Sequence, residues 1–178
     1  GAGKTRMAAE LAKRLVDEDQ IDLVLCFAPS CQVVEGFRTT FSSVLGRRLD
    51  GRIGAIGSAY TYQAMEFRDH DFWQLFSDYR VLAVFDEIHH CAGSDPSFSN
   101  AWGLQILCRI QDRARFTLAL SGTPWRTDDK GIALARYSTP DGQLICDYRY
   151  SLREAIADGV CRSPRIVLLD NSEVTLEE

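Results

Sequence analysis

Three short apolar segments that do not alternate with polar residues constrain the fold of this chain most strongly. They are DLVLCFA at 22–28, VLAVF at 81–85 and FTLAL at 116–120. Strands with apolar side chains on both faces are typical of a parallel sheet covered by helices. Segments of helical character separate them, at about 31–43, 63–76 and 98–111. This alternation predicts an open α/β fold whose mainly parallel sheet is sandwiched by helices.

Segments outside these runs extend the pattern. Residues 5–17 place Met7, Leu11 and Leu15 on one apolar stripe of a helix, with small alanines beside them. The polar, glycine-containing segment 127–147 is interpreted as a loop with one short strand.

A capping box at 151–154, Ser-Leu-Arg-Glu, predicts a short helix that ends at Gly159. The segment 165–169 has the character of one more strand, and 170–178 resembles the start of a linker. The chain therefore ends, by this interpretation, in a connection to another part of the protein.

The first five residues, Gly-Ala-Gly-Lys-Thr, match the second half of the phosphate-binding loop G-x-x-x-x-G-K-[ST]. Glycines let backbone N–H groups close around phosphates, Lys4 would reach the β- and γ-phosphates, and Thr5 would bind Mg²⁺. A helix that begins directly afterwards would point its positive end at the anion. The opening of the pattern would precede Gly1, so the loop is interpreted as incomplete. A glycine-rich turn with a surface lysine is the alternative for these residues taken alone.

A second motif, Asp-Glu-Ile-His at 86–89, follows the apolar run at 81–85. The carboxyl ends of parallel strands form the crevice where such sheets bind ligands. Asp86 would hold Mg²⁺ through water, and Glu87 would orient or deprotonate the attacking water. Two acids that merely cap a strand are disfavoured by the upstream Gly-Lys-Thr. Thr5 and Asp86 are expected to share one metal-bound triphosphate.

A third motif, Ser-Gly-Thr-Pro-Trp-Arg at 121–126, follows the last apolar run. Its small hydroxyl residues would bond His89 and sense whether phosphate is present. A plain strand-to-loop turn is the alternative interpretation.

In this order the three motifs resemble the first motor domain of superfamily 2 helicases and translocases, in the DEAH-like branch that includes type III restriction translocases and DNA-repair helicases. The tripeptides at 28–30 and 61–63 resemble the family's blocks that contact the nucleic acid, and 150–159 resembles the segment leading toward the second motor domain. The resemblance covers nearly the whole chain. It implies a RecA-like P-loop NTPase domain at 1–164 that lacks its first strand, with 165–178 starting the connection to a second motor domain.

The resemblance also implies a role for each matching residue. Those for ATP and Mg²⁺ are Gly1, Ala2, Gly3, Lys4, Thr5, Asp86 and Glu87, with Thr5 and Asp86 as metal ligands and Lys4, Asp86 and Glu87 as the catalytic group. Those that would couple the nucleotide state to strand binding are His89, Ser121, Thr123 and Arg126. Those along the nucleic-acid path are Pro29, Ser30, Thr61 and Gln63. The function implied is ATP-driven movement on nucleic acid, with DNA favoured over RNA.

Motors of this family receive an arginine from a second RecA-like domain, and such an arginine is worth roughly 10³–10⁵ in rate. The chain does not contain that domain, so we expect negligible ATP turnover from it alone. Two other functions stay open. One is a non-catalytic nucleic-acid-binding or scaffold fragment with relic motifs, and the other is a different P-loop enzyme such as a small-molecule kinase, which would not need the Asp-Glu-Ile-His motif.

The formal net charge of −5 is unusual for a nucleic-acid binder and predicts weak binding by this domain alone. No run approaches the roughly 20 apolar residues of a membrane span, and the chain does not open like a signal peptide, so a cytoplasmic protein without a membrane partner is predicted. The six cysteines show no C-x-x-C spacing. They are expected to be reduced, with Cys26 and Cys108 buried in apolar runs.

Two other clusters receive structural interpretations. The adjacent ligands of His-His-Cys at 89–91 seldom fit one tetrahedral site, so zinc is not predicted. Phe72, Trp73 and Phe76 have helical spacing and are predicted to pack on the sheet instead of stacking on bases.

Trp125 lies beside the third motif in a predicted loop. A role near the site and a hydrophobic plug are both open for it. Arg47, Arg48 and Arg52 form the nearest thing to a basic cluster and are interpreted as part of a solvated loop.

Overall fold

The computed structural model of the chain describes residues 3–93, 95–128 and 130–162. Contacts divide these residues into a large unit, Gly3–Cys146, and a smaller one that begins at Asp147. Gly1, Ala2, the predicted strand at 165–169 and the predicted linker at 170–178 lie outside the described residues.

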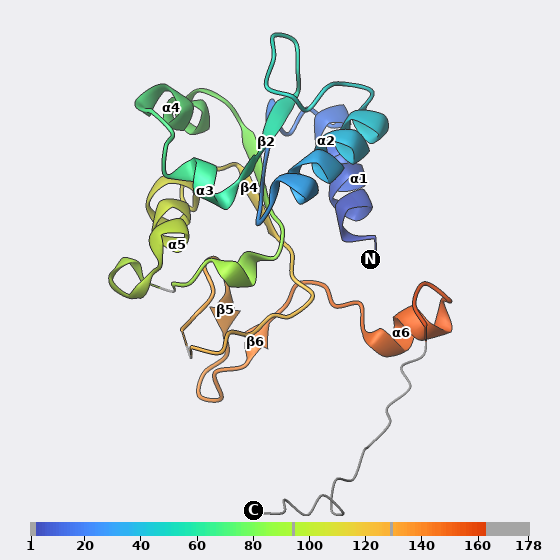
Figure 1. The fold of residues 1–178 in the computed structure, drawn as a ribbon, viewed down its shortest axis with the longest axis vertical. Coiled ribbons are helices and arrows are strands. Elements are labelled where there is room, and N and C mark those ends of the chain that lie inside the picture. The colour runs from blue at the N-terminus through green and yellow to red at the C-terminus, as the bar shows by residue number, and fades with distance from the viewer. Residues whose placement is uncertain (1–2, 94, 129, 163–178) are drawn as a thin grey trace, which may run out of the picture. The chain divides into compact units, whose positions relative to one another are not determined.

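A four-stranded sheet forms the centre of the large unit (Figure 1). Its strands are β1 (Leu23–Ala28), β2 (Gly57–Thr61), β3 (Val81–Phe85) and β4 (Phe116–Ala119). The order is β2-β1-β3-β4, and every neighbouring pair is parallel. The three apolar runs form β1, β3 and β4, so the predicted α/β fold with a mainly parallel sheet is confirmed.

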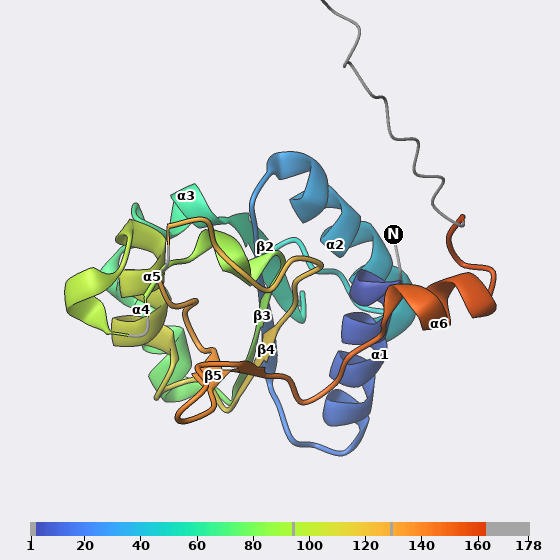
Figure 2. The same ribbon diagram turned by 90° about the horizontal axis from the view of Figure 1, so that it is seen from below.

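Helices cover both faces of this sheet, as two perpendicular views show (Figures 1 and 2). On one side lie α1 (Lys4–Asp17) and α2 (Cys31–Leu45), and on the other lie α3 (Tyr62–Met65), α4 (His70–Asp78) and α5 (Ala101–Gln105), which continues into a π-helix, η3 (Ile106–Ile110). The predicted helix at 63–76 is two helices, because the Asp69 side chain accepts a hydrogen bond from the Phe72 amide and starts α4 anew. Within the described residues, none of the helices is both long enough and apolar enough for a membrane span.

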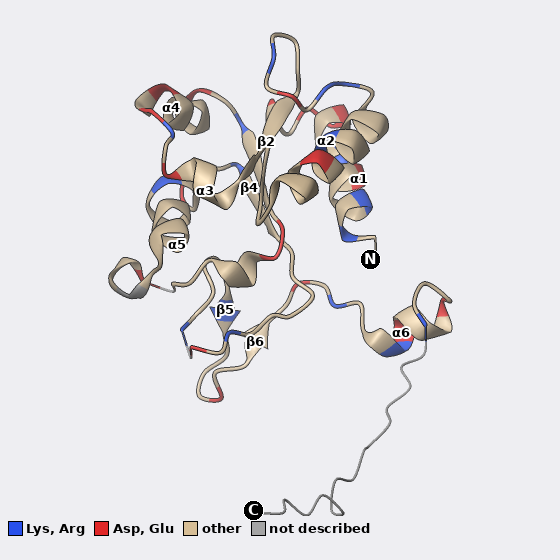
Figure 3. Cartoon of the chain, viewed as in Figure 1, with Lys and Arg blue, Asp and Glu red and all other residues tan. Residues whose placement is uncertain are grey.

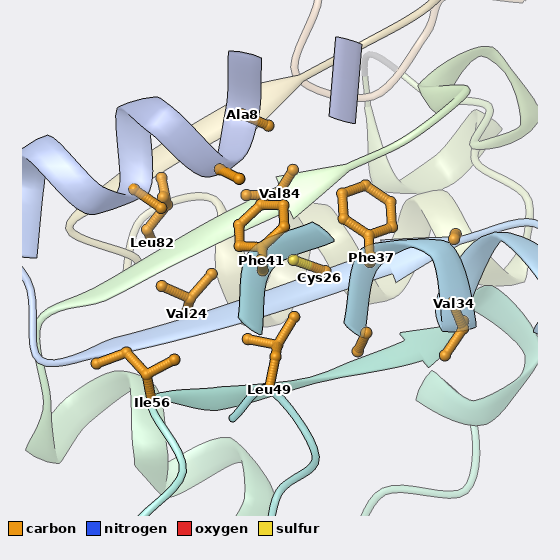
Figure 4. Packing of buried hydrophobic residues seen from close by; sticks show 14 of the residues in the cluster. Ala8, Val24, Cys26, Val34, Phe37, Phe41, Leu49, Ile56, Leu82 and Val84 are labelled. Carbon is orange, nitrogen blue, oxygen red and sulfur yellow. The ribbon is translucent and has the colours of Figure 1, made fainter. Parts of the chain in front are cut away.

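Two hydrophobic cores lie on the two faces of the sheet, because successive side chains of a strand point to opposite faces. In the first, Val24 and Cys26 of β1 pack beneath Phe37 and Phe41 of α2 (Figure 4). Cys26 is fully buried, as predicted.

The second core contains the three aromatic residues of α4. Phe72, Trp73 and Phe76 are 8%, 5% and 3% exposed and pack with Phe27 of β1 and Phe85 of β3. The prediction that they pack against the sheet is therefore confirmed.

Helix α1 approaches its neighbours through small side chains. Ala8, Ala9 and Ala12 are fully buried, whereas Met7 and Leu11 of the predicted apolar stripe are 41% and 37% exposed. The helix itself is confirmed, but its buried face is shifted toward the alanines. Alanine has only a methyl group, which lets the helix backbone lie close to α2 and the sheet.

Two predicted burials are wrong. In β4, Thr117 and Ala119 are exposed and the alternate residues are half-buried, because β4 is an edge strand of the sheet that the described residues form. Cys108 is exposed because Ile106 and Ile110, one helical turn apart, turn the opposite side of η3 to the core.

The segment 127–147, predicted as a loop with one short strand, contains two short strands. They are β5 (Arg136–Tyr137) and β6 (Leu144–Ile145), and they pair antiparallel. In the smaller unit, α6 (Leu152–Ala157) begins with the predicted capping box, in which Ser151 and Glu154 bond each other's backbone amides. The short helix predicted there is confirmed.

Strand β2 was not expected from an apolar run, because its sequence is GSAYT. It begins at Gly57, where an added Cβ would lie 1.8 Å from the carbonyl oxygen of Val24 in β1. The strand can pair in this register only because the residue has no side chain.

We expect Gly57→Ala to lower the free energy of unfolding by about 3 kcal/mol, the upper end of the cost of forced overpacking. The added methyl group meets backbone atoms of Val24, which cannot rotate away. Chemical denaturation of the chain measures the effect. Gly36→Ala on α2 is the matched control, since a Cβ there meets nothing within 4 Å, and it should stabilise by up to about 1 kcal/mol. Equal stability changes in the two variants would contradict this account of β2.

Candidate functional site

The candidate site is built at the first turn of α1. Gly3 caps the helix in the left-handed conformation, φ 77°, which favours glycine, and Lys4 and Thr5 follow within the helix. The first turn contains no acidic residue. Its free amides and the helix dipole therefore offer a positive end to an anion.

Lys4 contacts the second motif directly. Its Nζ lies 3.0 Å from Oε1 of Glu87, 83 positions along the chain. The side chains of Lys4 and Glu87 are 34% and 28% exposed, so a ligand can reach this ion pair from solvent. The structure thus brings the Gly-Lys-Thr and Asp-Glu segments together.

Glu87 also binds the third motif. Its Oε2 accepts a hydrogen bond of 3.2 Å from the Gly122 amide, and the Lys4 ammonium lies 3.5 Å from the position of a Cβ on Gly122. Burial raises the pKa of Glu87, but the hydrogen bonds from Lys4 and Gly122 outweigh it and hold the pKa below its ordinary value. Glu87 is therefore an ionised acceptor at neutral pH.

Asp86 has a different environment from its neighbour. It is 8% exposed, and its Oδ1 is buried without a hydrogen-bond partner among the described residues. Burial and then the Glu87 carboxylate raise its pKa. A buried carboxylate oxygen without a partner is costly unless a cation or donor satisfies it.

This oxygen fits the predicted role of Asp86 toward Mg²⁺. Mg²⁺ binds hard oxygen ligands and is usually held by one or two carboxylates together with water and substrate phosphates. The described residues contain no group of three or more His, Cys, Asp or Glu side chains that would hold a metal by themselves. The unpaired Asp86 oxygen therefore suits a metal that arrives with phosphate, and a contribution from the Thr5 hydroxyl stays a prediction.

The residues predicted to couple the site to strand binding form one network. His89 Nδ1 lies 2.8 Å from Ser121 Oγ and 3.4 Å from both Thr123 Oγ1 and Glu87 Oε2. Burial and then His90 lower the pKa of His89, so its imidazole is neutral at pH 7. A neutral ring has one donor and one acceptor nitrogen and can exchange hydrogen bonds with the hydroxyls around it.

Arg126, in the loop that follows β4, also contacts this network. Its guanidinium donates to the His89 carbonyl oxygen and pairs with Asp128, with an Nη2–Oδ2 distance of 2.6 Å. Trp125 beside it is 63% exposed, so the hydrophobic-plug interpretation is wrong. A role near the site stays open for this indole.

Of the four residues predicted along the nucleic-acid path, Pro29 and Ser30 follow β1, whereas Thr61 ends β2 and Gln63 lies in α3. Ala28 pairs with Thr61, so the carboxyl ends of these neighbouring strands are adjacent. Ser30 caps α2 and Thr61 caps α3, accepting bonds of 3.4 Å from the Val33 amide and 3.3 Å from the Ala64 amide. Pro29 is half-buried and Gln63 is exposed. Both hydroxyls thus also have a structural use, and their contact with nucleic acid stays a prediction.

Charges do not gather on one element of the described chain, where basic and acidic positions are interspersed (Figure 3). Arg47, Arg48 and Arg52 are exposed, and Arg48 and Arg52 lie 3.8 and 4.0 Å from Asp50. The interpretation of these three residues as part of a solvated loop is confirmed.

Tyr62 and Gly122 belong to the site region but had no predicted role. The Tyr62 side chain is fully buried and donates to the carbonyl oxygen of Asp86, and Gly122 donates its amide to Glu87. No sequence pattern predicts that the Gly122 amide or the Tyr62 hydroxyl would donate these hydrogen bonds, because both bonds join residues far apart in the chain.

The chain is similar to proteins of known sequence in two comparisons. A family model described as an AAA domain matches residues 1–129. The Uncharacterized protein ML1624 of Mycobacterium leprae (strain TN) is 42% identical over 86 residues, and the Uncharacterized protein Rv2917 of Mycobacterium tuberculosis (strain ATCC 25618 / H37Rv) is 42% identical over 87. Each match covers 47% of this chain and 13% of the relative, so the matched part is a small fraction of these curated relatives.

Proposed function

The chain belongs to the AAA domain family of P-loop NTPases, and from that premise we propose that it is the ATP-binding motor domain of a nucleic-acid-dependent ATPase. Within that class we propose a superfamily 2 DNA helicase or translocase. It hydrolyses ATP with Mg²⁺ when a second RecA-like domain completes the site. One observation carries the proposal. Glu87 bonds Lys4 on one side and Gly122 on the other, which ties the phosphate-binding motif to the loop of the third motif.

ATP binding must first separate Lys4 from Glu87, since the lysine cannot hold both a carboxylate and a phosphate at full strength. Lys4 then binds the β- and γ-phosphates, which lie against the amides at the start of α1. Asp86 and Thr5 would hold Mg²⁺, which would supply charge neutralisation at the phosphate oxygens.

Glu87 then acts on the attacking water. Freed from Lys4 and still held by the Gly122 amide, its carboxylate orients the water and accepts its proton. Because the Gly122 loop also carries Ser121, which bonds His89, a shift of this loop changes the placement of Glu87. This linkage supports a motor, in which nucleotide state and strand binding are coupled, over a small-molecule kinase.

The test is ATP hydrolysis by the full-length protein with and without single-stranded DNA, double-stranded DNA and RNA. We expect DNA to raise kcat at least about tenfold, within the usual range of coupling between two sites. Residues 1–178 tested by themselves should turn over at least about 10³-fold more slowly than the full-length protein, which is the rate that an arginine from a second RecA-like domain contributes in such motors.

Other outcomes favour the other functions. Hydrolysis without any response to nucleic acid favours another kind of P-loop enzyme. The net charge of −5 is the observation in favour of a scaffold with relic motifs, and failure of the full-length protein to bind Mg-ATP would support it.

A further inference from the structure

We propose that Tyr62 is a positioning residue that links the nucleic-acid-binding edge of the domain to the Asp86–Glu87 pair through a buried hydrogen bond. The inference rests on the proposed function. In this proposal Tyr62 contacts neither ATP nor nucleic acid, and it acts through the backbone of Asp86.

The hydrogen bond crosses the sheet. Tyr62 follows β2, Asp86 follows β3, and β1 lies between these two strands. The Tyr62 hydroxyl nevertheless donates to the Asp86 carbonyl oxygen over 2.8 Å. It therefore joins two strand ends that the sheet itself does not pair.

The acceptor is placed where a small movement matters. The carbonyl of Asp86 belongs to the peptide that joins the two carboxylate residues, so the hydroxyl fixes the plane of that peptide. Glu87 follows in the left-handed conformation, φ 50°, which non-glycine residues seldom adopt and which needs support from its surroundings. The peptide orientation in turn sets where the Glu87 carboxylate lies.

The donor is held as firmly as the acceptor. Tyr62 is 0% exposed, and its ring stacks on Trp102 with centroids 5.6 Å apart and an interplanar angle of 18°. Burial raises the pKa of Tyr62, so the hydroxyl keeps its proton and stays a donor throughout the working pH range.

Tyr62 lies between two residues that are predicted to contact nucleic acid. Thr61 caps α3 and Gln63 is exposed on its first turn, directly before and after Tyr62. A nucleic-acid strand bound to these two side chains would hold or shift the backbone of Tyr62. The shift reaches the Asp86 peptide through one hydrogen bond, without any rearrangement of the sheet.

Tyr62→Phe tests this, because it removes only the hydroxyl and keeps the ring on Trp102. The matched control is Tyr60→Phe, whose hydroxyl makes no hydrogen bond within the described residues and whose ring contacts Phe72 and Arg68. In the full-length protein, the Kd of a thymidine oligonucleotide and the Kd of a non-hydrolysable Mg-ATP analogue are measured separately and together. Thermal unfolding and DNA-stimulated kcat complete the set.

For Tyr62→Phe we expect each separate Kd to stay within about twofold of wild type, while the mutual effect of the two ligands falls at least about fivefold. DNA-stimulated kcat should fall about tenfold. Tyr60→Phe should keep the wild-type mutual effect of the two ligands and the wild-type DNA-stimulated kcat. Wild-type coupling in Tyr62→Phe overturns the inference and leaves the proposed function standing. A wild-type protein in which neither ligand affects the other contradicts the proposed function itself, and the inference with it.

Hydrogen exchange in the wild-type protein gives a second measurement that does not depend on the variant folding. Adding the oligonucleotide without nucleotide should slow amide exchange at 86–90 at least about threefold if the link exists. Exchange there that is unchanged, with slowing confined to 61–64, overturns the inference.

Discussion

Glu87→Gln should lower the DNA-stimulated kcat of the full-length protein by at least about 10²-fold, the contribution of a general base at the low end of its usual range. The glutamine oxygen can still accept the hydrogen bond from Gly122, so the loop keeps its place. The amide cannot take a proton from water. It also cannot form the ion pair with Lys4, so the Kd for Mg-ATP should stay within about threefold or become tighter.

Steady-state hydrolysis and equilibrium binding of Mg-ATP together test this separation of catalysis from affinity. Glu10→Gln is the matched control, because Glu10 makes an exposed ion pair with Arg6 on α1. It should leave both values unchanged. Wild-type turnover by Glu87→Gln would remove Glu87 from the mechanism.

Lys4→Ala should weaken Mg-ATP binding by at least about 10²-fold and abolish turnover with it, because the variant lacks the charge that meets the β- and γ-phosphates. The loss of Lys4 also removes a hydrogen bond that lowers the pKa of Glu87, so that pKa should rise. Lys4→Arg should restore only part of the affinity, since a planar guanidinium does not replace a point charge.

Titration with a fluorescent Mg-ATP analogue measures the affinity of each variant. Lys13→Ala, on the same helix and paired with Asp17 at the surface, is the control and should bind like wild type. Unchanged affinity in Lys4→Ala would contradict the assignment of this helix end as the phosphate site.

Sequence patterns were sufficient for those strands whose burial leaves an apolar run. β1 and β3 are buried on both faces, and their sequences contain only apolar residues. β2 was missed because its pairing depends on a close approach of Gly57 to the backbone of Val24, which is a property of the sheet. The exposure of β4 was missed for a related reason, since a strand does not encode whether it lies in the middle or at the edge.

For the candidate site, the sequence predicted Lys4, Asp86, Glu87 and His89 through local motifs, because phosphate-binding loops and acidic strand ends have characteristic residues at fixed spacing. Their chemical roles stay predictions. It could not tell which of two adjacent acids would meet the lysine. The tertiary structure pairs Lys4 with Glu87 and leaves the buried Asp86 oxygen without a protein donor.

The sequence by itself thus determined the fold class and predicted the chemical groups of the candidate site, since local hydrophobic and turn patterns indicate both. Only the tertiary structure decided which groups are hydrogen-bonded to each other: Tyr62 to Asp86 across β1, Gly122 to Glu87, and His89 to Ser121. The physical reason is that a hydrogen bond needs its two atoms within about 3 Å. Strand order and register, which are set by packing over the whole sheet, bring such distant residues that close.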